Sequence, residues 1–301
     1  MKKALILVVV GVAAVLLLIE VIGYGTKSAS SSSTRVVVGS ANFPENALLA
    51  DIYAGALDAK GVSTDTTLNL GSREVLFPAM KAGDIALVPE YSGSLLTYLS
   101  KGKSTATEVP AQVHELDAAL PHGLELLEPS AAQDRETITC TGTVARKYHL
   151  TSLEDLAPVS GKLVLGAPPE FPRRGGFGTE GLKRTYGIEF ADFRPLDTAG
   201  PLTVAALQDG KIDCANLFST QSAITTHDFV SLSDPKHLIQ SEAVLPLIST
   251  TAATPHVTRT LNAVSASLTT DALKAMVAKV EVDKQDPGDV AADFLATHHL
   301  D

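Results

Sequence analysis

Residues 66–94 carry the pattern that most constrains the fold of this chain. Its parts are, in order, a strand over 66–70, the turn Gly71-Ser72-Arg73-Glu74, a helix over 74–82 ended by Gly83, a strand over 85–88 and a loop over 90–93. A strand, a helix and a second strand in this order form a β-α-β unit, so both loops leave the carboxyl ends of parallel strands. Open parallel sheets bind ligands at that edge.

The same arrangement recurs 127 residues further along the chain. At this offset Gly39, Ile85, Tyr91 and Ser92 correspond to Gly166, Ile212, Phe218 and Ser219. We interpret the recurrence as two related lobes, each with an aromatic residue at an equivalent strand end. The predicted fold class is therefore α/β and two-lobed, with a mostly parallel, helix-flanked sheet in each lobe and a ligand cleft between the lobes.

The connections between the lobes define the expected domain limits. The chain leaves the first lobe near residue 133 and returns near residue 244, so lobe 1 covers 35–133 and 244–301 and lobe 2 covers 134–243. Two connections of this kind permit hinge closure around a ligand. After the first strand, Asn42 and Glu45 have the spacing of a capping box, and Pro44 suits the first helical turn.

The N-terminus has the pattern of an export signal. Lys2 and Lys3 precede an uncharged run over 4–19, and a Ser- and Gly-rich tract follows. We predict a signal peptide or signal-anchor over 1–30 and a linker over 31–34. No cysteine lies directly after the apolar run, so the chain has no lipobox cysteine to which a lipid could be attached. The protein is expected outside the cytoplasm, in the cell envelope, on the periplasmic or extracellular face of the cytoplasmic membrane.

Charge and motifs exclude several functions. A formal charge of −10 without a basic cluster argues against nucleic acid or an anionic membrane as the main partner. The sequence lacks an HExxH motif, paired Cys/His spacing and a phosphate-binding GxxxxGK(S/T) loop. We therefore predict no catalytic residues, no metal and no cofactor. Cys140 and Cys214 are either a disulfide or two small buried residues on neighbouring strands.

Four blocks of the chain together resemble a known family. They are GSANFPENALLADIYAGAL, NLGSREVLFPAMKAGDIALVPEYSGSLLTYL, KLVLGAPPEFPRRGGFGTEGLKRTYGI and GPLTVAALQDGKIDCANLFSTQSAI. Over about residues 35–298 the chain resembles the substrate-binding proteins of osmoprotectant ABC transporters, the ProX-like glycine betaine, carnitine and choline group, and its actinobacterial branch most of all. The resemblance implies the type II periplasmic-binding fold, a compatible solute as ligand, and a membrane permease with a separate ATPase subunit as partner. We expect a monomer.

The resemblance also implies a cage of aromatic rings around a quaternary ammonium group. Because the chain lacks tryptophan, the cage is assembled from Tyr91, Phe218, Phe43 and Phe171, and Glu90 adds a negative charge. The anionic end of a ligand would meet Arg73, Arg173 or the backbone N–H groups near Asn42 and Ser72. Ser219 and Thr220 follow a strand and complete the candidate set.

Other interpretations of these residues stay open. Each aromatic residue also suits a core, Arg73 also suits a salt bridge with Glu74, and the hydroxyl residues also suit helix caps. Phenylalanine in place of tyrosine favours a larger or more apolar solute than betaine. Two other functions are a tethered sensory module for a small organic or aromatic solute and an exported hydrolase that uses Glu90 as acid or base.

Overall fold

The computed structural model describes residues 35–174 and 176–301. The predicted signal segment 1–30 and linker 31–34 lie outside the described residues. No helix within the described ranges is both long and apolar enough to cross a lipid bilayer.

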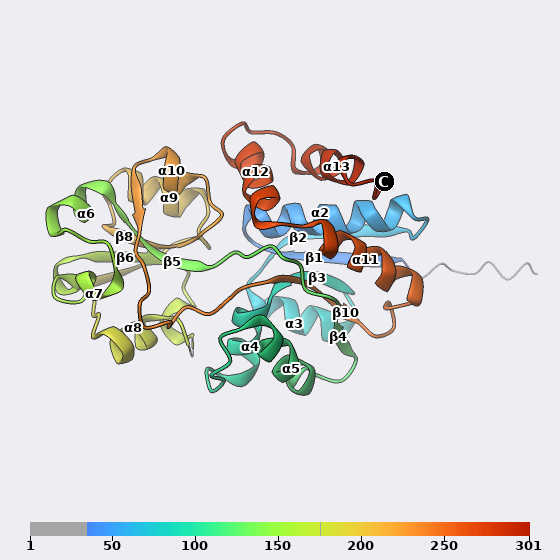
Figure 1. Ribbon diagram of the computed structural model, residues 1–301, viewed down its shortest axis with the longest axis horizontal. Coiled ribbons are helices and arrows are strands. Elements are labelled where there is room, and N and C mark those ends of the chain that lie inside the picture. Colours follow the sequence, from blue (N-terminus) through green and yellow to red (C-terminus); the bar gives the residue numbers. More distant parts are fainter. Residues whose placement is uncertain (1–34, 175) are drawn as a thin grey trace, which may run out of the picture. The chain divides into compact units, whose positions relative to one another are not determined.

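Two five-stranded sheets organise these residues (Figure 1). The first has the order β2-β1-β3-β10-β4 and the second the order β7-β6-β8-β5-β9. The strands of the first sheet are β1 (Val36–Ala41), β2 (Thr64–Gly71), β3 (Leu87–Tyr91), β4 (Leu124–Leu126) and β10 (Val244–Ser249). Those of the second are β5 (Glu136–Thr141), β6 (Val164–Ala167), β7 (Asp192–Pro195), β8 (Cys214–Phe218) and β9 (Phe229–Ser231).

The two sheets have the same topology. In the first, β1 pairs in parallel with β2 and β3, and β10 pairs antiparallel with β3 and β4. In the second, β6 pairs in parallel with β7 and β8, and β5 pairs antiparallel with β8 and β9. Four strands of each sheet therefore run one way and one runs against them, so each sheet is mixed. We call each sheet with its helices a lobe.

Helices cover both faces of each sheet. In the first lobe these are α2 (Pro44–Ala59), α3 (Arg73–Ala82), α4 (Ser92–Ser100), α5 (Val109–Ala119), α11 (Pro255–Ser267), α12 (Thr270–Glu281) and α13 (Pro287–Thr297). In the second they are α6 (Gly142–Tyr148), α7 (Leu153–Leu156), η1 (Ser160–Lys162), η2 (Phe171–Arg173), α8 (Thr179–Tyr186), α9 (Pro201–Gln208) and α10 (Ala223–Thr226). Helices α2, α11, α12 and α13 form one core with one face of the first sheet. Helices α3 and α4 form another core with the opposite face of that sheet.

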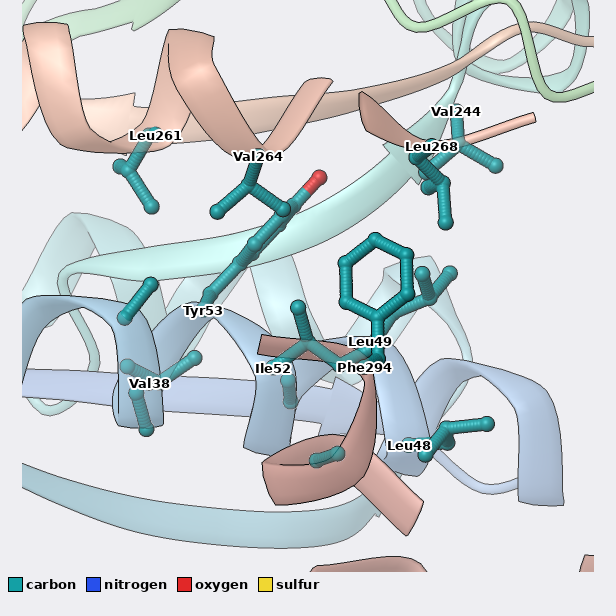
Figure 2. Packing of buried hydrophobic residues seen from close by; sticks show 14 of the residues in the cluster. Val38, Leu48, Leu49, Ile52, Tyr53, Val244, Leu261, Val264, Leu268 and Phe294 are labelled. Carbon is teal, nitrogen blue, oxygen red and sulfur yellow. The ribbon is translucent and has the colours of Figure 1, made fainter. Parts of the chain in front are cut away.

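Helix α2 is the most deeply buried helix of the first lobe. Its side chains Leu48, Leu49, Ile52 and Tyr53 are at most 1% exposed, because the helix lies between the sheet and the C-terminal helices. Figure 2 shows these side chains in one cluster with residues of α11 and with Phe294 of α13. This double cover explains why α2 is apolar around most of its circumference rather than along one stripe.

The chain passes between the sheets twice, and the two passages pair with each other. Gln133 and Ala243 form an antiparallel bridge, and the Asp134 N–H donates to the Glu242 carbonyl at 3.0 Å. The strand that follows each passage, β5 or β10, is the antiparallel strand of the sheet it enters. The domain limits at 133/134 and 243/244 stay predictions.

Two local predictions were wrong. Residues 90 and 91 are not a loop, because antiparallel pairing with β10 extends β3 to Tyr91, opposite Val244. Asn42 is not a helix cap, because α2 begins after Phe43 without a side-chain cap. The Glu45 carboxylate, predicted to complete the capping box, instead accepts hydrogen bonds from Tyr91 and Thr220.

Gly39 explains part of the repeat in the sequence. A methyl group at Gly39 would lie 2.7 Å from Ile85 Cδ1, and one at Gly166 would meet Ile212 Cδ1 in the second lobe. Each lobe therefore packs an isoleucine directly against the bare backbone of the strand beside its central strand, β1 in the first sheet and β6 in the second.

We predict that Gly39→Ala lowers the free energy of unfolding by about 1–3 kcal/mol through overpacking. Because Ile85→Val removes Cδ1, the double variant should lose less stability than the two single variants together. Urea denaturation measures all three. Gly161→Ala is the matched control, since its nearest non-neighbouring atom is 3.9 Å away. Additive losses in the double variant would contradict the packing argument.

Candidate ligand-binding site

Three aromatic rings meet where the two lobes face each other. Phe43 precedes α2, Tyr91 ends β3, and Phe218 ends β8 of the second lobe. The centroid of the Phe43 ring lies 4.8 Å from that of Phe218 and 6.0 Å from that of Tyr91. Tyr91 and Phe218 occupy equivalent strand ends, so the topology of both sheets delivers them to the same place.

A cavity of about 50 Å³, the inner cavity, lies against these rings. Its lining comes from both lobes. It consists of Ala41, Asn42, Phe43, Asn46, Ser72, Arg73, Leu76, Pro89, Glu90, Tyr91, Ser94, Asp134, Glu136, Glu170, Arg174, Thr198 and Phe218. A larger outer cavity of about 670 Å³ shares Ser72, Arg73, Ser94, Glu136, Glu170 and Arg174 with it. Shared walls make the two cavities adjoining parts of one cleft.

Arg73 and Glu90 form an ion pair in the wall of the inner cavity. Arg73 Nη2 donates to Glu90 Oε2 at 2.7 Å, and Arg73 Nε approaches both carboxylate oxygens at 3.0 and 3.1 Å. The Tyr91 N–H donates to the same carboxylate at 3.1 Å. Such a two-pronged pair satisfies both groups, so Glu90 does not face the cavity as an uncompensated charge.

A second arginine is held in the same way from the other lobe. Arg174 Nη1 pairs with Glu136, and Arg174 Nη2 donates to Glu170 Oε1 at 3.1 Å. The Arg174 guanidinium carbon lies 5.6 Å from the centroid of the Phe171 ring. The two arginines that line the inner cavity are therefore both paired with carboxylates.

Two buried carboxyl groups lie behind the aromatic rings. Glu45 accepts from Tyr91 Oη at 2.8 Å and from Thr220 Oγ1 at 2.5 Å. Burial raises the pKa of Glu45 to about 7, against the lowering effect of these hydrogen bonds. Burial, and then the nearby Glu45 charge, raise the pKa of Asp134 well above its usual value.

A third buried carboxyl group belongs to the second passage between the lobes. Glu242 accepts from the Ser94 N–H at 2.9 Å and from Ser94 Oγ at 2.8 Å. Burial raises the pKa of Glu242 to about 8. This side chain lines the outer cavity.

The structure brings most of the predicted site residues together. The inner cavity is lined by Phe43, Tyr91, Phe218, Glu90, Asn42, Ser72 and Arg73, and the outer cavity by Arg173. Phe171 is fully buried in the core of the second lobe, edge-on to Phe177. Ser219 and Thr220 lie behind the cavity wall, where both hydroxyl groups contact Asp134.

Several lining residues were not predicted from the sequence. These are Asp134, Glu136, Glu170, Arg174 and Thr198. The first two lie where the chain enters the second lobe, so their position at a predicted crossing was a usable signal. The sequence holds no comparable signal for Thr198, which donates to Asn42 Oδ1 at 3.4 Å across the lobes.

Cys140 and Cys214 are joined by a disulfide. The two residues are opposite partners in the antiparallel pairing of β5 with β8. The bond therefore ties the entering strand to the centre of the second sheet. Within residues 35–174 and 176–301, no three His, Cys, Asp or Glu side chains are grouped so that they could hold a metal ion.

Comparison with known families yields a match over nearly the whole described chain. The model of the OpuAC family, the substrate binding domain of the ABC-type glycine betaine transport system, matches residues 34–297. The glycine betaine-binding protein YehZ of Escherichia coli (strain K12) is 29% identical over 277 residues, which cover 88% of this chain and 90% of that protein. A glycine-betaine-binding protein of Pseudomonas aeruginosa is 26% identical over 279 residues, covering 87% of this chain and 88% of that protein.

Solved structures show the same fold. The crystal structure of a glycine betaine/carnitine/choline ABC transporter protein superposes with a TM-score of 0.67 at 23% identity, covering 88% of this chain and 99% of the other. Lactococcal OpuAC, closed and complexed with glycine betaine, superposes with a TM-score of 0.61 at 16% identity, covering 88% and 96%. These matches confirm the predicted type II periplasmic-binding fold.

Glu242 predicts how stability depends on pH. Its raised pKa means that the folded protein binds its proton more tightly than the unfolded chain, so its contribution to stability is complete below the unfolded pKa of about 4.5 and is lost as pH rises to about 8. We expect the free energy of unfolding of Glu242→Gln to depend less steeply on pH than that of the wild-type protein. The two slopes should differ by up to about 1.4 kcal/mol per pH unit in that range.

Urea denaturation between acidic and mildly alkaline pH measures the difference between the variant and the wild-type protein. The exposed Glu115→Gln is the control. Parallel pH profiles for wild type and Glu242→Gln would contradict the assignment.

Proposed function

Because the chain belongs to the OpuAC family of substrate-binding domains of ABC-type glycine betaine transport systems, we propose that it captures a small quaternary ammonium solute in the cleft between its lobes. Like the other members of this family, it is a binding component of an importer and not an enzyme. Relatives named for glycine betaine and for carnitine, and solved relatives complexed with glycine betaine and with choline, support this class of ligand.

The observation that carries the proposal is the group of three rings drawn from both lobes. Phe43, Tyr91 and Phe218 contact one another and line a cavity whose wall also holds carboxyl groups. An aromatic face attracts a cation with roughly 0.5–2 kcal/mol, most where water is excluded. Because one ring belongs to the second lobe, a cation bound among the rings is also a contact between lobes.

The other residues of the predicted site support the ring group. Asn42 and Ser72 offer polar contacts for the rest of the solute, and the Arg73–Glu90 pair forms the adjoining wall. Arg173 faces the outer cavity, where it can meet an anionic end of a longer solute. Ser219 and Thr220 contribute indirectly, because their hydroxyl groups contact Asp134 of the cavity wall. Phe171 contributes indirectly too, because its ring packs against the guanidinium group of Arg174.

Closure of the lobes is the proposed mechanism of capture. The bodies that move are residues 35–133 with 244–301, and residues 134–243, joined by the paired passages at Gln133 and Ala243. A hinge of two short segments permits closure with few backbone changes. The closed form would present a solute-dependent surface to a membrane permease driven by a separate ATPase subunit, with this chain acting as a monomer outside the cytoplasm. We also propose an actinobacterial relationship, which is supported by the resemblance of the sequence alone.

The two other functions are less well supported. A hydrolase would need Glu90 as acid or base, but its carboxylate is held by Arg73 and by the Tyr91 N–H. A tethered sensory module would use the same cleft and differ only in its partner. A permease and ATPase gene pair beside this gene would favour import over sensing.

Phe218→Leu tests the ring group, because leucine keeps apolar volume and removes the aromatic face. We expect the affinity for choline to fall by roughly 3–30-fold, the equivalent of one cation–π contact. Isothermal titration calorimetry measures the change. Affinity for 3,3-dimethyl-1-butanol, the uncharged carbon analogue of choline, should change little in the same variant.

Phe77→Leu is the matched control, since Phe77 packs against Tyr98 and lines neither cavity. Equal losses for choline and for its uncharged analogue would reject a cation–π role for Phe218. Absence of binding to choline, glycine betaine and carnitine by the wild-type protein would reject the proposed function itself.

A further inference from the structure

Two buried carboxyl groups from different parts of the chain meet at one hydroxyl group. Thr220 Oγ1 lies 2.5 Å from Glu45 Oε2 and 3.0 Å from Asp134 Oδ1. Glu45 is 4% exposed and Asp134 2%. Glu45 comes from α2 of the first lobe, Asp134 from the first passage and Thr220 from the loop after β8, so the cluster joins both lobes and the hinge.

The hydrogen-bond donors around this pair are unevenly distributed. Asp134 Oδ1 receives the Thr220 N–H at 3.1 Å and Ser219 Oγ at 3.2 Å. Asp134 Oδ2 is buried and has no hydrogen-bond partner among the described residues. Since Asp134 lines the inner cavity, one unsatisfied acceptor oxygen belongs to a residue of the cavity wall. A buried acceptor without a donor is destabilising, and the positive charge of a cationic solute in the inner cavity would offset part of that cost.

The contacts of the Thr220 hydroxyl group indicate the charge of the Glu45–Asp134 pair. The Thr220 hydroxyl has one proton, yet its oxygen contacts a carboxyl oxygen on each side. A proton on one carboxyl group supplies the missing donor. Two buried carboxylates this close also repel each other, so one proton is shared between them. The raised pKa values of Glu45 and Asp134 agree with this geometry.

The surrounding charges do not neutralise the pair. Glu281 of α12 adds a negative charge near Glu45, and Tyr91 of β3 donates a neutral hydroxyl. Across the inner cavity, Arg73 is paired with Glu90, and Arg174 with Glu136 and Glu170. Every arginine that lines the described inner cavity thus already has a carboxylate partner, and a cationic solute would bring this cavity a positive charge that is not already paired.

We propose that Glu45 and Asp134 share a proton before a cationic solute binds and release it to water when the solute enters, so that capture is coupled to proton release. This inference rests on the proposed function, and it makes Asp134 a residue that senses the charge of the ligand. The charges balance: the pair changes from one negative charge to two as one positive charge arrives.

The coupling predicts a pH dependence of binding. The cation favours the fully ionised pair, so protonation of the pair competes with binding. Affinity for the cation should therefore rise with pH. It should level off above the raised pKa of Glu45, about 7. Between about pH 6 and pH 8 the dissociation constant for choline should fall by roughly tenfold.

The experiment is calorimetric titration of the full chain with choline at about pH 6.5, in two buffers that differ in ionisation enthalpy. The difference in observed heat gives the protons released per choline bound. We expect roughly half to one proton for the wild-type protein. Asp134→Asn keeps an acceptor for the Ser219 and Thr220 donors but cannot share the proton, so release should fall to near zero and the pH dependence should flatten.

Asp51→Asn is the matched control, because Asp51 lies on the same helix as Glu45, has a pKa raised by burial and lines neither cavity. It should release as many protons as the wild type. Choline binding by the wild-type protein without proton release overturns the inference and leaves the proposed function standing. Release that persists in Asp134→Asn assigns the proton to another group and also overturns it. Absence of any choline or glycine betaine binding overturns the proposed function instead.

Discussion

The antiparallel strand placed beside the centre of each sheet is the constraint on which the site depends. Strand β10 pairs with β3, which sets Val244 opposite Tyr91, and β5 pairs with β8, which sets Glu136 opposite Phe218. Each antiparallel strand follows directly on a passage between the lobes. The aromatic end of each central strand is thereby held beside the hinge. The inner cavity and the two passages between the lobes are consequently built from neighbouring residues, so a solute held by both rings, as we propose, would act on the hinge at short range.

Electrostatics in this cleft is governed by burial. Carboxyl groups outnumber arginines around the inner cavity, and each lining arginine is already paired. The pairs hold the walls in place and leave acidic groups behind the rings without a cationic partner among the lining residues. A site of this kind attracts positive charge, and it does so through groups whose protonation depends on their surroundings. Affinity for a cation and titration of the site are therefore aspects of the same arrangement.

Much of the fold was predictable because its signals are local. Gly39 and Gly166, Ile85 and Ile212, and Tyr91 and Phe218 keep one offset, and the structure gives both sheets the same strand order around them. The extent of β3 was not predictable, since Glu90 and Tyr91 join the strand only through pairing with β10, more than 150 residues further along. The capping role of Asn42 and Glu45 failed for a similar reason: local propensity predicted a cap, while Tyr91 and Thr220 offered Glu45 better partners.

The sequence by itself determined the two-lobed α/β class and the family, because periodicity, glycine positions and strand-end residues are properties of short segments. Of its four predicted cage aromatics, Phe43, Tyr91 and Phe218 line the cavity, whereas Phe171 is in the core of the second lobe. Only the tertiary structure decided the partners of the charged residues. Arg73 selects Glu90 over the adjacent Glu74, Arg174 joins two acids of its own lobe, and Asp134 and Glu45 meet at the Thr220 hydroxyl. The reason is physical: a charge removed from water is stabilised by whichever group the packing brings within hydrogen-bonding distance, and separation along the chain does not encode that distance.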